Sequence, residues 1–294
     1  MNDTPWFIPY LLGIRASDHS SRFVNGIAPG FTPSMFTHIH FDLLPAGLTL
    51  ITFIVILTCL LQIVFIRLMG RDRILRCHDV GGNYFAVVGT FYAVLLGLVI
   101  FDAQSRFEES KNNFEKEASS ITVLYATLDA LPKNEVAEIK SHLSQYVDWA
   151  ISYEWKSMTE GKADAQTRDE LIKVTKLIQK VQPHSERESI AMDKVQDRLA
   201  EIWEMRRQRI DDCTYSIAGF EWATILLGGF FTVFFTFFFV MEDIAMQIAM
   251  TAIVAIVISV NIYLVYQFGN PYSGEIRISK NSFESVQEYI ADNP

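Results

Sequence analysis

Hydrophobic and polar positions separate into long blocks along this chain. Four runs carry no charged residue, and each has about 20–25 residues, the length with which a tilted α-helix crosses the hydrocarbon core of a bilayer. They are Ala46–Ile66, Gly81–Phe101, Trp222–Met241 and Ile244–Phe268. Because soluble cores rarely contain four such runs, the pattern predicts four transmembrane helices.

The second run does not stop where its hydrophobic part stops. From Asp102 to Leu131 the chain is largely polar but contains neither proline nor glycine, so we expect one helix that leaves the membrane without a break. An apolar stripe recurs every seven residues, with a second set four residues later: Phe107, Phe114, Ile121 and Leu128, then Lys111, Ala118 and Tyr125. This spacing is typical of helix-on-helix packing of the coiled-coil kind.

The polar segment between the second and third runs predicts three more amphipathic helices. The first covers Asn134–Met158, the second ends near Pro183, and the third begins at an S-x-x-E capping box, Ser185 to Glu188. We expect this third helix to continue directly into the third transmembrane helix.

The predicted fold class is therefore an all-α membrane protein, with a helical bundle inserted between spans two and three and helices continuous with the spans. The expected divisions are residues 1–45, an N-terminal interfacial segment; 46–101, spans one and two; 102–216, the insertion; 217–268, spans three and four; and 269–294, a tail with a turn at Asn270–Gly274 and a short last helix.

The segment before the first span holds a pattern that bears on metal binding. His38, His40 and Asp42 alternate, so in an extended chain they share one side and could hold a metal ion. The simpler interpretation is that they are polar residues at the level of the lipid headgroups.

Charge narrows the classes of partner and the location. The formal net charge of -9 argues against nucleic acid, so the bilayer itself is the partner that the composition predicts. Most lysines and arginines near the spans fall on the side of the termini and the insertion, which predicts that these face the cytoplasm of a bacterial cell; Arg67, Arg71, Arg73 and Arg76 in one loop argue the other way.

No enzyme motif stands out. The sequence lacks a nucleophile elbow, a phosphate-binding glycine loop and an H-E-x-x-H zinc pattern, so we expect neither catalysis nor a cofactor. His142 and His184 have no obvious partner and are interpreted as surface residues. The three cysteines, Cys59, Cys77 and Cys213, have no metal-type spacing and are interpreted as packing residues or free thiols.

Two stretches carry a family resemblance. Leu95–Leu98, with sequence LLGL, is followed after seven residues by Arg106, Phe107 and Glu108; the tail carries NPYSGE at Asn270–Glu275. Together with the topology, these resemble bestrophin anion channels, and the chain looks most like the bacterial bestrophin-like membrane family. Where animal bestrophins carry an acidic calcium clasp, this chain has Glu275, Ile276, Arg277 and Ile278, so we expect no calcium gate.

The resemblance implies a homo-oligomer, with a pentamer favoured, that conducts inorganic anions such as chloride. It places rings of the pore on Thr90, Val94 and Leu98 of span two, which share one helix face; the alternative is that these residues only pack against neighbouring spans. Two other functions stay open: a proton-driven stator-like energy-coupling protein, and a non-conducting membrane scaffold or sensor.

Three further interactions are predicted near the spans. Asp102 and Arg106 lie one turn apart at the membrane exit, so an ion pair is available; its role is either to hold the helix at the pore mouth or, through Arg106, to attract anions. Gln247 and Asn261 in span four are expected to form hydrogen bonds between helices.

Overall fold

The computed structural model describes residues 44–70, 78–214, 217–239, 241 and 243–293, and within these ranges the regular structure is entirely helical. The predicted metal pattern at His38, His40 and Asp42, and the arginines of the loop from Arg71 to Arg76, lie outside the described residues. Cys59 and Cys213 are free thiols, as expected.

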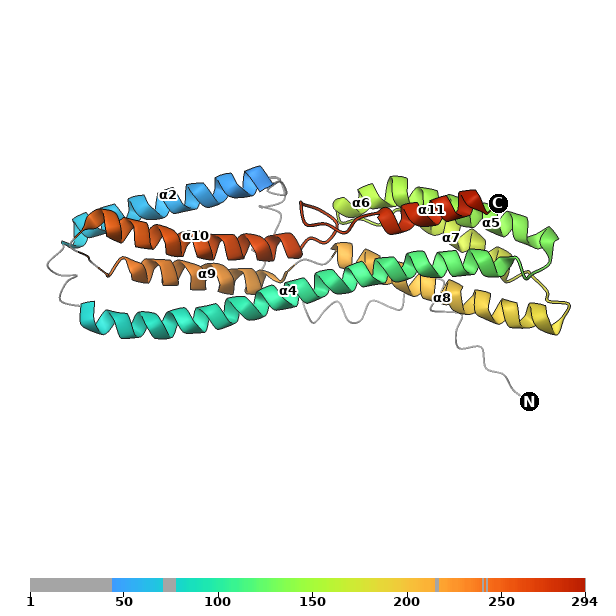
Figure 1. The fold of residues 1–294 in the computed structure, drawn as a ribbon, viewed down its shortest axis with the longest axis horizontal. Coiled ribbons are helices and arrows are strands. Elements are labelled where there is room, and N and C mark those ends of the chain that lie inside the picture. The colour runs from blue at the N-terminus through green and yellow to red at the C-terminus, as the bar shows by residue number, and fades with distance from the viewer. Residues whose placement is uncertain (1–43, 71–77, 215–216, 240, 242, 294) are drawn as a thin grey trace, which may run out of the picture. The chain divides into compact units, whose positions relative to one another are not determined.

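Four helices have the length and apolar composition to cross a membrane, as the sequence predicts. They are α2 (Leu44–Met69), α4 (His78–Leu128), α9 (Gly219–Thr236) and α10 (Ile244–Phe268). Helix α10 packs against the other three, and α4 also packs against α9 (Figure 1). The prediction for span three was wrong at its end: α9 stops at Thr236, and residues 237–239 continue as turns, with the N–H of Phe237 donating to the carbonyl of Phe234 at 3.0 Å.

Helix α4 is one continuous rod of 51 residues, which confirms the expected uninterrupted exit from the membrane. It ends in a tight turn in which the N–H of Leu131 donates to the carbonyl of Leu128 at 3.0 Å. Pro132 then occupies the N-cap of α5, a position where its missing N–H costs nothing.

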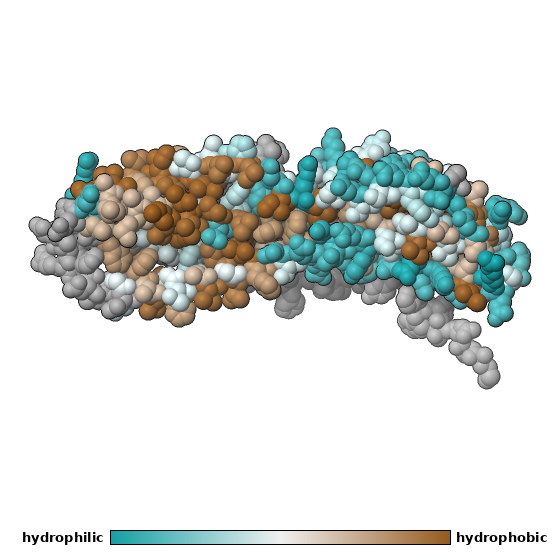
Figure 2. All heavy atoms as spheres, viewed as in Figure 1, coloured by the Kyte–Doolittle hydropathy of each residue, from teal (hydrophilic) through white to brown (hydrophobic). Residues whose placement is uncertain are grey.

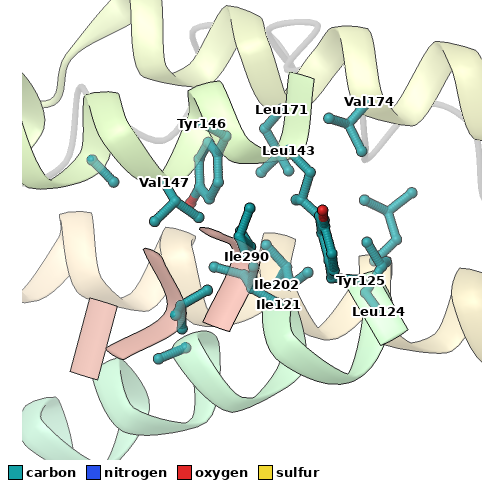
Figure 3. Packing of buried hydrophobic residues seen from close by; sticks show 14 of the residues in the cluster. Ile121, Leu124, Tyr125, Leu143, Tyr146, Val147, Leu171, Val174, Ile202 and Ile290 are labelled. Atoms are coloured by element: carbon teal, nitrogen blue, oxygen red, sulfur yellow. The ribbon is translucent and has the colours of Figure 1, made fainter. Parts of the chain in front are cut away.

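The insertion forms a helical bundle around the lower part of α4. Its helices are α5 (Lys133–Trp149), α6 (Trp155–Thr159), α7 (Ala165–Ile178) and α8 (Glu186–Thr214), and the bundle is completed by α11 (Asn281–Asp292) of the C-terminal tail. Helix α8 runs along α4, and α11 packs against both α4 and α5. The buried core includes Ile121, Leu143, Tyr146, Ile202 and Ile290 (Figure 3).

The stripe predicted on α4 is the core face of the bundle. Phe107, Phe114, Ala118, Ile121, Tyr125 and Leu128 are all buried, whereas Lys111 is exposed. The hydrophobic residues of the transmembrane helices and the hydrophilic surface of the bundle are separate areas in the view of Figure 2. The predicted amphipathic pattern of α4 is therefore confirmed, and its one charged residue, Lys111, lies outside the core.

Two helix boundaries differ from the prediction. The helix expected over Asn134–Met158 contains a π-helical turn, η2 (Ala150–Glu154), between α5 and α6. Helix α8 does not continue into span three: it ends at Thr214, and α9 starts anew at Gly219, where the Glu221 carboxylate accepts a hydrogen bond from the N–H of Ala218 at 3.3 Å.

The start of α8 was predicted correctly. The hydroxyl of Ser185 accepts from the N–H of Glu188 at 3.2 Å, which satisfies a free donor in the first turn. The Glu188 carboxylate reaches back to the N–H of His184 at 2.7 Å, one residue earlier than in an ideal capping box.

Candidate functional site

One face of α4 has no partner among the residues that the structure describes. Thr90, Val94 and Leu98 are exposed, with exposed fractions of 58% for Val94 and 66% for Leu98. Beyond Leu98, residues at steps of three or four positions along α4 lie on this same face of the helix. Its exposed members there are Phe101, Ser105, Glu108, Asn112, Lys116, Ser119 and Val123. We refer to this set, from Thr90 to Val123, as the open stripe.

The opposite face of α4 is fixed to the rest of the protein. Tyr92 lies over the glycine pair of α9, so closely that a Cβ on Gly228 would fall 2.6 Å from its ring. Leu96, one turn further, is also buried. Because these contacts set the rotation of the helix, they determine that Thr90, Val94 and Leu98 point away from the chain.

The predicted pair at the membrane exit is present. The guanidinium Nε of Arg106 donates to Oδ2 of Asp102 at 2.8 Å, and both side chains are about half exposed. An exposed pair of this kind contributes about 0.3–0.5 kcal/mol to helix stability. The ion pair between Asp102 and Arg106 is therefore present as predicted. Its geometry is compatible with both predicted roles, holding the helix and attracting anions.

A hollow of about 370 Å³ lies beside this pair, where α4 meets α8 and the end of α10. Acidic side chains dominate its polar lining, and they are Asp102, Glu109, Asp211, Asp212 and Glu221. Ser110 donates to Asp212 at 2.7 Å, yet burial raises the pKa of Asp212, and Glu109 and Asp211 raise it further. Across the described residues, no group of three or more acidic, histidine or cysteine side chains is arranged to hold a metal ion.

A buried ionic network joins α4 to the bundle, and the sequence analysis missed it. Arg209 of α8 donates through Nε to Glu117 of α4 at 2.7 Å and through Nη2 to Glu154 of η2 at 2.8 Å. Arg206, also on α8, pairs with the other oxygen of Glu154, and the hydroxyl of Tyr146 donates to Glu117 at 2.5 Å. All five side chains are nine-tenths or more buried.

The network holds its charges by mutual pairing. Burial lowers the pKa of Arg209, but Glu117 and Glu154 outweigh this and leave its pKa well above the ordinary value. Burial raises the pKa of Tyr146 well above its usual range, and the negative charge of Glu117 adds to the rise. The network therefore brings two carboxylates and two guanidinium groups into contact inside the core, and removing one of them would leave its partners buried without a counter-charge.

The sequence offered two signals for this network. Glu117 falls on the buried side of the predicted α4 stripe, and Arg206 and Arg209 fall three residues apart on α8. Charged residues are almost never fully buried unless they are paired, so a glutamate on the buried side predicts a cation nearby, whereas Lys111 of the same stripe is exposed and needs no partner. The partner Glu154 could not be located in this way, because it lies in the π-helical turn, where the helical period shifts.

Two predictions about isolated polar residues were wrong. Asn261 donates to the carbonyl of Val257 at 2.8 Å within its own helix, because a side-chain amide can reach the carbonyl one turn earlier. Gln247 accepts a hydrogen bond from the N–H of Met241 at 3.3 Å, in the connection before α10 and not in another helix. The link between helices is made by Gln62 of α2, which donates to Thr251 of α10 at 2.8 Å.

His142 is not the partnerless surface residue that was expected. Its Nδ1 lies 2.9 Å from the carboxylate of Glu170, which joins α5 to α7. Lys173 donates to the other oxygen of Glu170 at 2.7 Å. Burial acts to raise the pKa of Glu170, but the hydrogen bonds from Lys173 and His142 outweigh it, so the pKa is lowered. His184 is exposed, as predicted.

Comparisons with solved structures find the same fold in bacterial membrane proteins. A single-residue variant of a bacterial bestrophin homolog from Klebsiella pneumoniae superposes with a TM-score of 0.67 at 16% identity, covering 82% of this chain and 98% of that chain. A second structure of the bestrophin homolog from Klebsiella pneumoniae, phased with zinc, gives a TM-score of 0.64 at 16% identity, covering 82% and 97%. No curated protein matches the sequence.

The sequence itself gives the family directly. The model of the Bestrophin-like domain matches residues 52–283, a range that starts inside α2 and ends in α11. It therefore spans all four transmembrane helices and the inserted bundle. Because this match covers most of the chain and agrees with its four membrane-spanning helices and inserted bundle, the chain belongs to the Bestrophin-like family.

Proposed function

We propose that this protein is the subunit of a homo-oligomeric channel for small inorganic anions, with α4 lining a central pore. The open stripe is the observation that carries this proposal. It runs along α4 from the span into the bundle and changes from apolar at Val94 and Leu98 to polar at Ser105 and Asn112. A helix that lines a pore through both the membrane and the aqueous mouth needs such a change.

The surface beside the open stripe suits a second copy of the chain. Gly97 lies next to Leu98 at one edge of it, and a Cβ added to Gly97 or to Gly89, two turns earlier on the same side, would meet no atom within 4 Å. Small residues let helices approach closely in a membrane, so a neighbouring subunit could pack there while the stripe faces the axis. A closed ring, for which the family resemblance favours five copies, leaves no unpaired edge.

In this arrangement Val94 and Leu98 would form apolar rings that gate conduction by dewetting, with Thr90 as a more polar ring. The bundle and both termini would lie in the cytoplasm, as the distribution of lysine and arginine favours.

Cysteine accessibility tests the proposal against a matched control. In a background where Cys59, Cys77 and Cys213 are serine, Val94→Cys and Leu98→Cys are compared with Leu60→Cys on α2, which is equally exposed in the single chain at 55%. In planar bilayers, a water-soluble thiol reagent should block currents through the two α4 variants and leave the α2 variant unaffected.

The contrary result is equally clear. If no current flows under any polarity and neither α4 cysteine reacts, these side chains face lipid or protein. A monomer or dimer by mass in detergent would also contradict a pore between subunits and would favour the scaffold alternative.

A further inference from the structure

A small polar cluster lies inside the transmembrane helices, away from α4. It consists of Gln62 on α2, Thr236 at the end of α9, and Gln247 and Thr251 in the first two turns of α10, and all four side chains are buried. Since α9 begins beside the bundle and ends at Thr236, the cluster lies at the end of the membrane helices that is remote from the bundle.

Three of these residues form a directed chain of hydrogen bonds. The amide nitrogen of Gln62 donates to Thr251 at 2.8 Å, the hydroxyl of Thr251 donates to that of Thr236 at 3.2 Å, and Thr236 donates to the carbonyl of Val233 at 2.6 Å. Both hydroxyl protons are thereby used, so neither threonine can donate to anything else.

Two amide atoms of the cluster have no partner among the described residues. They are Oε1 of Gln62, whose side chain is fully buried, and Nε2 of Gln247, whose side chain is 3% exposed. Gln247 lies one helical turn before Thr251, which binds Gln62, so both atoms belong to the same cluster. A buried polar atom without a partner destabilises the folded state, so a ligand that satisfied both atoms would stabilise the fold.

The chemistry of the two atoms selects the ligand. One is an acceptor and the other a donor, so a cation would oppose the N–H group of Gln247 and an anion would oppose the carbonyl of Gln62. The ligand must therefore be neutral and able both to donate and to accept. Phe65, one turn after Gln62, is in ring contact with Phe237, which follows Thr236, with the ring centroids 5.8 Å apart.

We propose that this cluster binds a water molecule, which donates to Oε1 of Gln62 and accepts from Nε2 of Gln247. Buried waters typically make about two to four hydrogen bonds to otherwise unsatisfied groups, and this pair supplies one acceptor and one donor. The water would fix α2 to α10 near the membrane surface. It does not depend on the proposed conduction pathway along α4.

Radiolytic footprinting in lipid nanodiscs tests this proposal, because X-rays convert bound water into hydroxyl radicals that oxidise adjacent side chains. The reporter is Phe237, which is 6% exposed and follows Thr236; the reference is Phe114, 1% exposed in the core of the bundle. We expect the oxidation rate of Phe237 in the unmodified protein to exceed that of Phe114 several-fold.

A variant removes the proposed ligands while keeping the volume. In Gln62→Met/Gln247→Met the oxidation rate of Phe237 should fall to that of Phe114, while that of the exposed Tyr153 stays unchanged as a check on the fold. Equal rates at Phe237 and Phe114 in the unmodified protein would overturn the proposal, even if the variant did not fold. So would a Phe237 rate that the double substitution leaves unchanged.

Discussion

The bundle and the transmembrane helices are built on opposite principles. The bundle closes around an apolar core that contains an ionic network, with Arg209 at its centre. The transmembrane helices bury few of their side chains, and their exposed residues are large and apolar. Lipid can cover such residues without cost, whereas water cannot.

This difference decides what an exposed residue means in each region. In the membrane, the exposure of Val94 or Leu98 is compatible with lipid, a neighbouring subunit or a pore. In the bundle, the exposure of Val123 at 42% leaves an apolar side chain in water on the same side of α4. Single exposed apolar residues are common on soluble surfaces, so what marks the lower half of the open stripe is its polar side chains, such as Ser105 and Asn112, which suit contact with water.

The largest expected effect is in the bundle. Arg209→Met leaves Glu117 and Glu154 buried without their main cation, so we expect the bundle to lose about 3–5 kcal/mol of unfolding free energy. Arg207→Met is the control, because Arg207 lies two residues away but pairs only on the surface with Glu204 and Asp211, and it should cost less than about 1 kcal/mol. Denaturant unfolding followed by the fluorescence of the bundle tryptophans measures both, and equal losses would refute a special role of the network.

The next effect is in the membrane region. Gly228→Ala places a Cβ 2.6 Å from the ring of Tyr92, so α4 or Tyr92 must shift, at a cost of about 1–3 kcal/mol. The control is Gly219→Ala at the start of the same helix, where a Cβ would meet nothing within 4 Å, and which should leave the melting temperature in detergent unchanged or raise it. The same loss in both variants would mean that α4 is not anchored through this face.

A third prediction connects the two regions through the charges of the open stripe. If the stripe lines an anion pathway, Glu108→Gln should increase the unitary anion conductance by about two-fold and Lys116→Gln should decrease it to a similar extent, because fixed charge sets the local ion concentration. Glu160→Gln, which removes an exposed carboxylate in the loop after α6, should have no effect on single-channel currents. An effect from Glu160 as large as that from Glu108 would assign the change to general surface charge.

The smallest effect is the pH dependence of the link between α5 and α7. The pKa of Glu170 is lowered by Lys173 and His142, so its stabilising contribution is present above the ordinary glutamate pKa of 4.5 and is lost as the pH falls through the lowered value. In Glu170→Gln, the melting temperature at neutral pH should fall. Its further decrease between neutral and acid pH should be smaller than in the unmodified protein, because the variant has no carboxylate here to protonate. A variant whose melting temperature falls with acid as steeply as that of the unmodified protein would contradict this assignment.

Local patterns along the chain were sufficient for much of the fold. The charge-free runs predicted the four transmembrane helices. Helix α10 has the predicted bounds, because the Asp243 side chain caps its first turn and a turn follows Phe268. The absence of proline and glycine from Asp102 to Leu131 predicted that α4 continues beyond its hydrophobic part, and the seven-residue stripe predicted its buried face. The placement of Asp102 next to Arg106 also follows from the helical period alone.

Contacts between distant segments were decided only by the tertiary structure. The partner of Glu117 lies 92 positions along the chain, at Arg209, and the π-helical turn that supplies Glu154 breaks the period on which sequence reasoning depends. The sequence determined which residues are apolar and how each helix repeats, because these are local properties. Tertiary packing determined how α4 is rotated, and therefore that Thr90, Val94 and Leu98 face away from the chain, because that rotation depends on Tyr92 meeting the glycines of α9.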